Sequence, residues 1–145
     1  MDVVTASDPR LSRIQCLSLL GMASVGRVAF SHRAMPAIVP VTFVMVRDHL
    51  VVAADDRALL DYARDGAVVA FQADQDDQDA EAVWSVTCVG RAHRLALHDE
   101  DRRIAGATGL AGTRERQFLR IDADLLDGRR FLRRPLATTE LPISW

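Results

Sequence analysis

The segment from Met35 to Asp74 constrains the fold more than any other part of the sequence. It contains two long runs rich in β-branched residues with a tight turn between them, then one short helical segment and a third apolar run. Strands joined by such a short turn pair in an antiparallel sheet, and the helix can close one end of that sheet. The segment therefore predicts the core of a β-barrel with a helical plug.

Further strands and helices are expected around this core. Ser12 and Gln15 have the spacing of a capping box, so a helix should begin there, with Ile14, Leu17 and Leu20 forming the apolar stripe that lies on the sheet. Alternating or β-branched patterns predict strands at 27–31, 37–46, 50–54, 67–71, 83–97 and 117–121, and helices at 57–64 and 99–109.

Two of these strands have features that bear on binding or assembly. Pro40 lies inside the 37–46 run and lacks a backbone donor, which favours a sheet edge or a bulge. An edge proline is the simpler interpretation, although such a break also exposes backbone groups to a planar ligand.

In the strand that includes Val83 to Val89, both alternating faces are largely apolar. A strand covered on both sides suits a barrel that also meets a partner subunit, so we expect a homodimer.

Two polar stretches are interpreted as turns. The carboxylates between Asp74 and Glu81 lack the central glycine and the terminal glutamate of an EF-hand loop, so they indicate a solvated turn rather than a calcium site. The dipeptide Asp127-Gly128 has the composition of a hairpin turn. The four histidines have no metal-ligand spacing, so no metal is expected.

Length, charge and cysteine content narrow the class of protein. The chain has 145 residues, 49% of them hydrophobic, which suits one domain over 11–135 with an arm at 1–10 and a tail at 136–145. A net charge of -2 offers no basic surplus for nucleic acid, and no apolar run approaches the length of a membrane span. The two cysteines have no CxxC spacing and the N-terminus has no signal pattern, so a cytoplasmic protein is expected.

No catalytic motif is recognised in the chain. A GxSxG elbow, a P-loop and a GxGxxG turn are all missing from the sequence. Cys88 lies among apolar neighbours in a strand and Cys16 lies on the first helix, so neither has the features of a nucleophile. The catalytic residues are therefore not identified from the sequence.

Five segments resemble those of a known family. They are VGRVAF (25–30), MPAIVPVTFV (35–44), VVAFQAD (68–74), WSVTCVGRA (84–92) and RIDADLLDGRR (120–130). In this order they are similar to the flavin-binding split-barrel proteins, and more narrowly to the small actinobacterial members of the pyridoxamine 5'-phosphate oxidase-like superfamily. The resemblance implies a mainly β protein with flanking helices, built on a six-stranded split β-barrel, which forms a homodimer with an FMN site between the subunits.

The resemblance also implies which residues contact the flavin. One group would lie along the isoalloxazine ring, and a second would face the site from the strand near the dimer seam. These groups are Pro40, Val41, Thr42 and Phe43, and Trp84 and Ser85, respectively.

The phosphate end of the site departs from the family pattern. Family members commonly hold the FMN phosphate with an arginine and a threonine after the third strand, and with a serine and a lysine after a short turn. A phosphate dianion needs such charge-assisted donors, each worth about 1.5 to 3 kcal/mol. In this chain the four positions are occupied by Ala53, Ala54, Ala58 and Leu59.

Arg57 is the cation that remains near these positions, at the start of the predicted helix. Asp55 and Asp56 stand beside it, which favours a local ion pair and a helix cap over a phosphate site. We therefore expect FMN to bind weakly or not at all, with a deazaflavin as the alternative cofactor. Two functions follow: a flavin-dependent or deazaflavin-dependent oxidoreductase with an eroded phosphate site, or a cofactor-free split-barrel dimer that acts as a binding or structural module.

Overall fold

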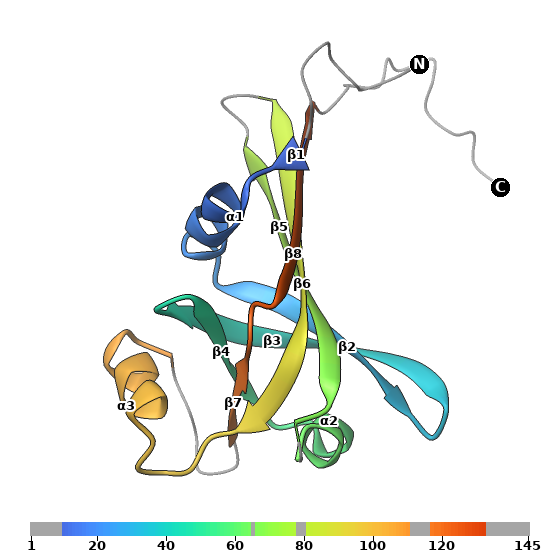
Figure 1. Ribbon diagram of the computed structural model, residues 1–145, viewed down its shortest axis with the longest axis vertical. Helices are drawn as coiled ribbons and strands as arrows, with labels where there is room; N and C mark the ends of the chain where they lie inside the picture. The colour runs from blue at the N-terminus through green and yellow to red at the C-terminus, as the bar shows by residue number, and fades with distance from the viewer. Residues whose placement is uncertain (1–9, 65, 78–80, 111–116, 133–145) are drawn as a thin grey trace, which may run out of the picture.

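The computed structural model describes residues 10–64, 66–77, 81–110 and 117–132. Within these residues, six strands form a closed antiparallel barrel, and two more strands and three helices lie around it (Figure 1). The barrel strands are β2 (Val25–His32), β3 (Met35–Val46), β4 (His49–Ala54), β5 (Val68–Asp77), β6 (Ala82–Arg94) and β7 (Gln117–Ile121). The other elements are β1 (Arg10–Leu11), β8 (Leu125–Leu132), α1 (Arg13–Leu20), α2 (Arg57–Tyr62) and α3 (Glu100–Ala107).

The long strand β6 explains why the barrel is split. One edge of β6 pairs with β5, while its other edge pairs first with β8, over 82–89, and then with β7, over 92–94. The change of partner occurs at Gly90, where a Cβ atom would collide with the carbonyl oxygen of Asp122. Only glycine lets the chain pass so close to the strand at this point. The expected mainly β fold with a six-stranded split barrel is confirmed.

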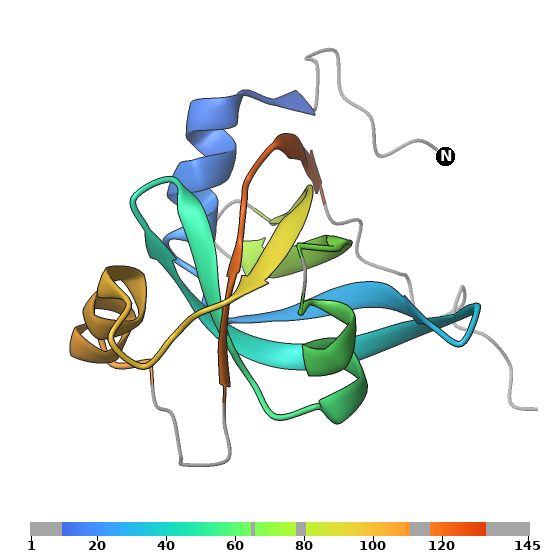
Figure 2. The ribbon, with the colours of Figure 1, turned by 60° about the horizontal axis from the view of Figure 1, so that its bottom comes forward.

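The barrel is filled by apolar side chains and closed at one end by α2. Phe43 and Phe71 meet edge to face at its centre, with their ring centroids 4.8 Å apart. Leu59, Leu60 and Ala63 project from α2 and the residue after it into the same core. This helix lies at the lower end of the barrel in Figure 1 and comes to the front in Figure 2. The predicted helical plug is therefore confirmed.

Helix α3 covers a second, smaller core on the outside of β4 and β7. Ala105 of α3 and Leu110 pack there with Val51 and Phe118 of those strands. The guanidinium of Arg102 lies 4.6 Å from the centre of the Phe118 ring. The barrel wall beneath α3 is thus buried on both sides.

Helix α1 begins as predicted but buries a different face. The amide of Gln15 donates to Ser12 Oγ, and the amide of Ser12 donates to Gln15 Oε1, which completes the capping box. The predicted stripe was wrong at Ile14, whose side chain is 80% exposed, because Cys16 and Leu20 are the buried residues of this helix. The sequence pattern favoured burial of the larger side chain of Ile14, whereas the side chain that packs against the sheet is the smaller thiol of Cys16.

One predicted turn and the first part of another, Asp74 to Asp77, are strands in the structure, whereas Glu81 lies in a turn and 78–80 are outside the described residues. β5 continues through the acidic stretch to Asp77, paired with β6 along its length. Asp127 and Gly128 lie inside β8, opposite Thr87 and Val86 of β6. Pairing with the long strand β6 outweighs the local turn preference in both places. These strands extend beyond the barrel toward α1, as Figure 1 shows.

The two chain ends were expected to be an arm and a tail. β1 pairs with β8 from Arg10, the last residue of the predicted arm, so this residue belongs to the sheet. Residues 1–9 and the tail at 136–145 lie outside the described residues. None of the described helices is long and apolar enough to cross a membrane.

Candidate functional site

The strands β3, β2, β5, β6 and β8 present one continuous surface on the side of the sheet away from the barrel interior. Cross-strand register places its outward residues in rows across the sheet. We call this surface the outer face. It is defined by Arg27, Ala29, Ile38, Pro40, Ala70, Gln72, Asp74, Val83, Ser85, Thr87, Val89, Leu125, Asp127, Arg129 and Phe131.

A polar row crosses the middle of the outer face. It runs through directly paired positions from Pro40 to Arg27, Gln72, Thr87 and Asp127. Within it, Gln72 Nε2 donates to Thr87 Oγ1 at 3.2 Å. Two hollows of about 320 and 180 Å³ meet at these two side chains. The row therefore offers amide, hydroxyl and guanidinium groups to whatever covers this surface.

Ion pairs flank this polar row. Arg27 Nη1 lies 3.6 Å from Asp74 Oδ1, and Arg129 Nε lies 3.8 Å from Asp127 Oδ2. All four side chains are about half exposed, so these pairs contribute little to stability in the single chain. Their donors and acceptors remain accessible to a ligand or a partner.

An apolar row lies next to the polar one. Ile38, Ala29, Ala70, Val89 and Leu125 follow each other in register across five strands. The residues at its two ends, Ile38 and Leu125, are 66% and 67% exposed in the single chain. An apolar row of this length on an open sheet face is typical of a surface that another molecule covers.

The structure divides the residues predicted at the isoalloxazine ring between two faces of β3. Pro40 and Thr42 point outward, whereas Val41 and Phe43 are buried in the barrel. Pro40 pairs only with Arg27 of β2, because the register between β3 and β4 begins at Thr42. The predicted edge position of this proline is confirmed.

Trp84 and Ser85 lie on opposite faces of β6. Ser85 belongs to the outer face, while the indole of Trp84 is 5% exposed and faces α1. In the sheet, β6 is separated from β3 by β5 and β2, which corresponds to about 14 Å at the usual strand spacing. One chain therefore does not bring Ser85 next to Thr42.

The four positions expected at the phosphate are largely inside the protein. Ala54 and Leu59 belong to the main core and are 4% and 0% exposed, and Ala53 is buried beneath α3. Ala58 is half-buried and packs against the main core. None of these side chains carries a hydrogen-bond donor, so they do not fit a phosphate group.

Arg57 lies outside the core, in a hollow of about 250 Å³ beside α2. Arg94 and Gln117 share this hollow, and Asp55 and Asp61 line it as well. The described lining of this hollow thus carries two carboxylates and two guanidinium groups, and one of the carboxylates, Asp61, also pairs with Arg64 at 3.4 Å. Sequence reasoning missed Arg94, which the fold brings here from the end of β6.

One of the two aspartates before α2 has a structural role. The amide of Leu59 donates to Asp56 Oδ1 at 2.9 Å, so Asp56 is the N-cap of the helix. The predicted helix cap is confirmed at this residue.

The remaining reactive side chains have structural partners. Both cysteines are buried, and burial raises the pKa of the Cys88 thiol to about 12, which leaves it protonated at neutral pH. His49 Nε2 lies 2.7 Å from Asp101 Oδ2, and His93 Nε2 lies 3.0 Å from Asp122 Oδ2. Across the described part of the chain, no three His, Cys, Asp or Glu side chains gather as a metal site would require.

Comparison with known proteins shows which protein family this sequence matches. The sequence model of the family described as pyridoxamine 5'-phosphate oxidase matches residues 12–130. The Mycobacterium tuberculosis protein Rv0080 is 34% identical over 91 residues, which span 59% of this chain and 60% of that protein.

Two solved structures share the fold over most of their length. The FAD binding protein from Mycobacterium smegmatis superposes with a TM-score of 0.71 at 28% identity, covering 86% of this chain and 98% of its own. A FAD-binding protein from Mesorhizobium loti also gives 0.71, at 24% identity, covering 83% of this chain and 96% of its own.

Proposed function

The chain belongs to the pyridoxamine 5'-phosphate oxidase family, and we propose that it is a homodimeric oxidoreductase that takes a flavin or a deazaflavin as a loosely held, exchangeable ligand. The observation that carries the proposal is the packing of Ala54 and Leu59 in the barrel core. Side chains that would hold a phosphate in family members are here part of the apolar interior. The protein is therefore expected to lose FMN during purification.

A flavin remains the best-supported ligand class. A solved structure that is 28% identical to this chain is described as a FAD binding protein. In such proteins the flavin ring supplies the hydride chemistry, and the protein supplies position and electrostatics. The outward-facing Pro40 and Thr42 leave one side of β3 open to a ring, while the phosphate end offers no matching donors.

The outer face supports the homodimer. Its apolar row is exposed in the single chain, and its polar row carries both charges of Arg27 and Asp127. A two-fold related copy would bury the apolar row and bring its own Ser85 toward the β3 of its neighbour. We also propose a cytoplasmic location, which suits a chain whose two cysteines are free.

A cofactor-free dimer is the second candidate. It is favoured by the same loss of phosphate donors at Ala54 and Leu59, since a fold can outlast its site. In this case the outer face would serve only for assembly.

Flavin content and flavin titration separate the two candidates. The protein is purified without added flavin, its visible absorbance is recorded, and FMN, FAD and a deazaflavin are titrated by quenching of ligand fluorescence. We expect a colourless protein that binds at least one of them saturably, with a Kd in the micromolar range, about −8 kcal/mol. Absence of binding by all three would support the cofactor-free dimer. Yellow protein with nanomolar FMN affinity would contradict both candidates.

A further inference from the structure

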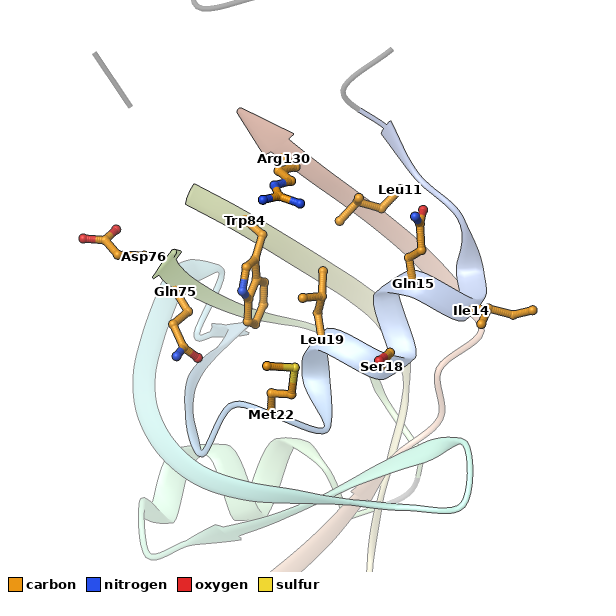
Figure 3. A pocket seen from close by; sticks show the side chains of 10 residues that line it. All are labelled: Leu11, Ile14, Gln15, Ser18, Leu19, Met22, Gln75, Asp76, Trp84 and Arg130. Carbon is orange, nitrogen blue, oxygen red and sulfur yellow. The ribbon is translucent and has the colours of Figure 1, made fainter. Parts of the chain in front are cut away.

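A pocket of about 670 Å³ lies on the side of β6 opposite to Ser85, between the sheet and α1 (Figure 3). Its floor is a cross-strand row in which Trp84 is paired with Gln75 of β5 on one side and with Arg130 of β8 on the other. Leu19 and Met22 face this floor from α1 and the turn after it. The pocket is thus enclosed by a helix on one side and by three strands on the other.

The way α1 is anchored explains why this space is not filled. Cys16 and Leu20 are the buried side chains of α1, and Cys16 packs directly on Gly128, where a Cβ atom would collide with its Sγ. The helix is therefore held close to β8 along that face. The neighbouring face, with Leu19, packs against the core that includes the 5% exposed Trp84, and the pocket lies beside this contact.

Size and chemistry indicate a small ligand. Pockets that hold small organic molecules commonly measure about 300 to 1,000 Å³ and combine apolar walls with a few polar groups. Trp84 borders the pocket with the small accessible part of its indole, and Met22 is 69% exposed although its flexible thioether readily packs against a ring. An exposed methionine at the rim of an apolar pocket is what a bound ring system would cover.

The polar groups lie at the ends of the floor row. The amide of Gln75 is at one end and the guanidinium of Arg130 is at the other. Arg130 and Asp76, which also lines the pocket, both interact within the protein already. The guanidinium carries a positive charge at its end of the pocket, which an oxygen acceptor or an anionic group of a ligand can approach, while the Asp76 carboxylate lies at the end with Gln75.

We propose that this pocket binds a small amphipathic aromatic compound, with its flat apolar ring system against Leu19 and Met22, next to the accessible edge of Trp84, and its acceptor or anionic group at Arg130. The proposal uses none of the residues assigned to the flavin ring on β3. It does use Trp84, which the family resemblance assigned to the flavin but which lies on the opposite face of β6 from Ser85.

A pair of fluorescent probes tests the pocket. The chain has two tryptophans, so the variant Trp145→Phe leaves Trp84 as the single indole reporter. The probes are 8-anilinonaphthalene-1-sulfonate and N-phenyl-1-naphthylamine, which has the same ring system without the sulfonate. We expect both to bind saturably, with one probe per chain, and to quench the emission of Trp84.

Two variants locate the probe. Ser18 is exposed on α1 and lines the pocket, so Ser18→Phe fills it without entering the core, whereas Ser31→Phe makes the same exchange on β2. Ser18→Phe should weaken both probes by about tenfold or more, the loss expected when about 1.4 kcal/mol of contact is removed, and Ser31→Phe should leave them unchanged. Equal responses to the two exchanges would overturn the proposal.

A third variant tests the polar end. Arg130→Gln should weaken the sulfonate probe by about tenfold, the value of one charge-assisted hydrogen bond, and the neutral probe by less than about twofold. Equal weakening of both probes would overturn the assignment of Arg130. Failure of either probe to bind the Trp145→Phe protein would overturn the pocket itself, since it would show that the space is closed or covered in solution.

Discussion

Glycine at two positions determines how closely the elements of this fold approach each other. Gly90 lets the chain cross β6 at Asp122, and Gly128 lets Cys16 of α1 touch β8. Sequence composition alone suggested a turn at Asp127-Gly128, because glycine after aspartate is common in turns. The actual requirement is steric and comes from a helix more than a hundred residues earlier in the chain. Such a long-range contact leaves no local pattern to read.

The contact at Gly128 predicts a coupling between two substitutions. Gly128→Ala places a methyl group against Cys16 Sγ and within 3.2 Å of Leu11, so it should destabilise the protein by about 1 to 3 kcal/mol. In a Cys16→Ala background the same change should cost at least about 1 kcal/mol less, because the sulfur is gone. Urea unfolding of the four proteins in this cycle measures the coupling. Strictly additive effects would show that the two positions do not touch.

Burial of the thiols predicts their reactivity and a pH effect. Because burial raises the pKa of Cys88 from 9.0 to about 12, it should resist alkylation in the folded chain and react only after denaturation. The unfolded chain loses this proton first as the pH rises, so the stability contributed by neutral Cys88 should decrease between pH 9.0 and about 12. Mass spectrometry after iodoacetamide treatment, and unfolding at several pH values, check the two outcomes. Rapid labelling of Cys88 in native protein would contradict the buried position.

At the scale of whole elements, side-chain periodicity predicted most strands and also predicted that one helix, α2, closes the end of the barrel. The alternation in β6 placed Trp84, Val86 and Cys88 on one face because a pleated strand has a fixed period of two. The plug helix α2 was also predicted, with Leu59 and Leu60 inward. The extension of β5 into the acidic stretch was not, since pairing with β6 rather than composition keeps that segment extended.

The candidate site was predictable only in part, for the same reason. The missing phosphate donors can be read directly, because each departure is a single residue at an aligned position. The polar row from Arg27 to Gln72 and Thr87 cannot be read, since its members are far apart in sequence and meet through strand register. Arg94 likewise reaches Arg57 only through the closure of the barrel.

Helix α3 offers a prediction about its attachment. Asp101 is 5% exposed. Its carboxylate accepts a hydrogen bond from Arg47 Nη1 at 3.2 Å and lies 2.7 Å from His49 Nε2. These two contacts tie α3 to the turn between β3 and β4. Asp101→Asn should cost about 1.5 to 3 kcal/mol, because both charge-assisted contacts weaken. Glu100→Gln is the control: its pair with Arg47 is 3.3 Å long but exposed, and its loss should cost less than about 1 kcal/mol. Denaturant unfolding that ranks the two variants equally would contradict this attachment.

At the scale of the whole molecule, the outer face is the surface through which we propose that the homodimer forms. Ala70 lies in the centre of the apolar row, between Ala29 and Val89. Ala70→Arg should place a charge in the interface and convert the proposed dimer into a monomer. Ala107→Arg, an exposed exchange on α3, should leave the dimer intact. Sedimentation velocity distinguishes the outcomes, and a wild-type monomer at micromolar concentration would contradict the proposed assembly.

We propose that this split barrel keeps the fold of its family without a clamp for the flavin phosphate. The most direct measurement is the ratio of the Kd values for riboflavin and FMN, since the two ligands differ only by the phosphate. With Ala54 and Leu59 in the core, we predict that the two affinities agree within about threefold, less than 1 kcal/mol. A preference for FMN of about a hundredfold or more would mean that charge-assisted donors hold the phosphate, and it would contradict the account.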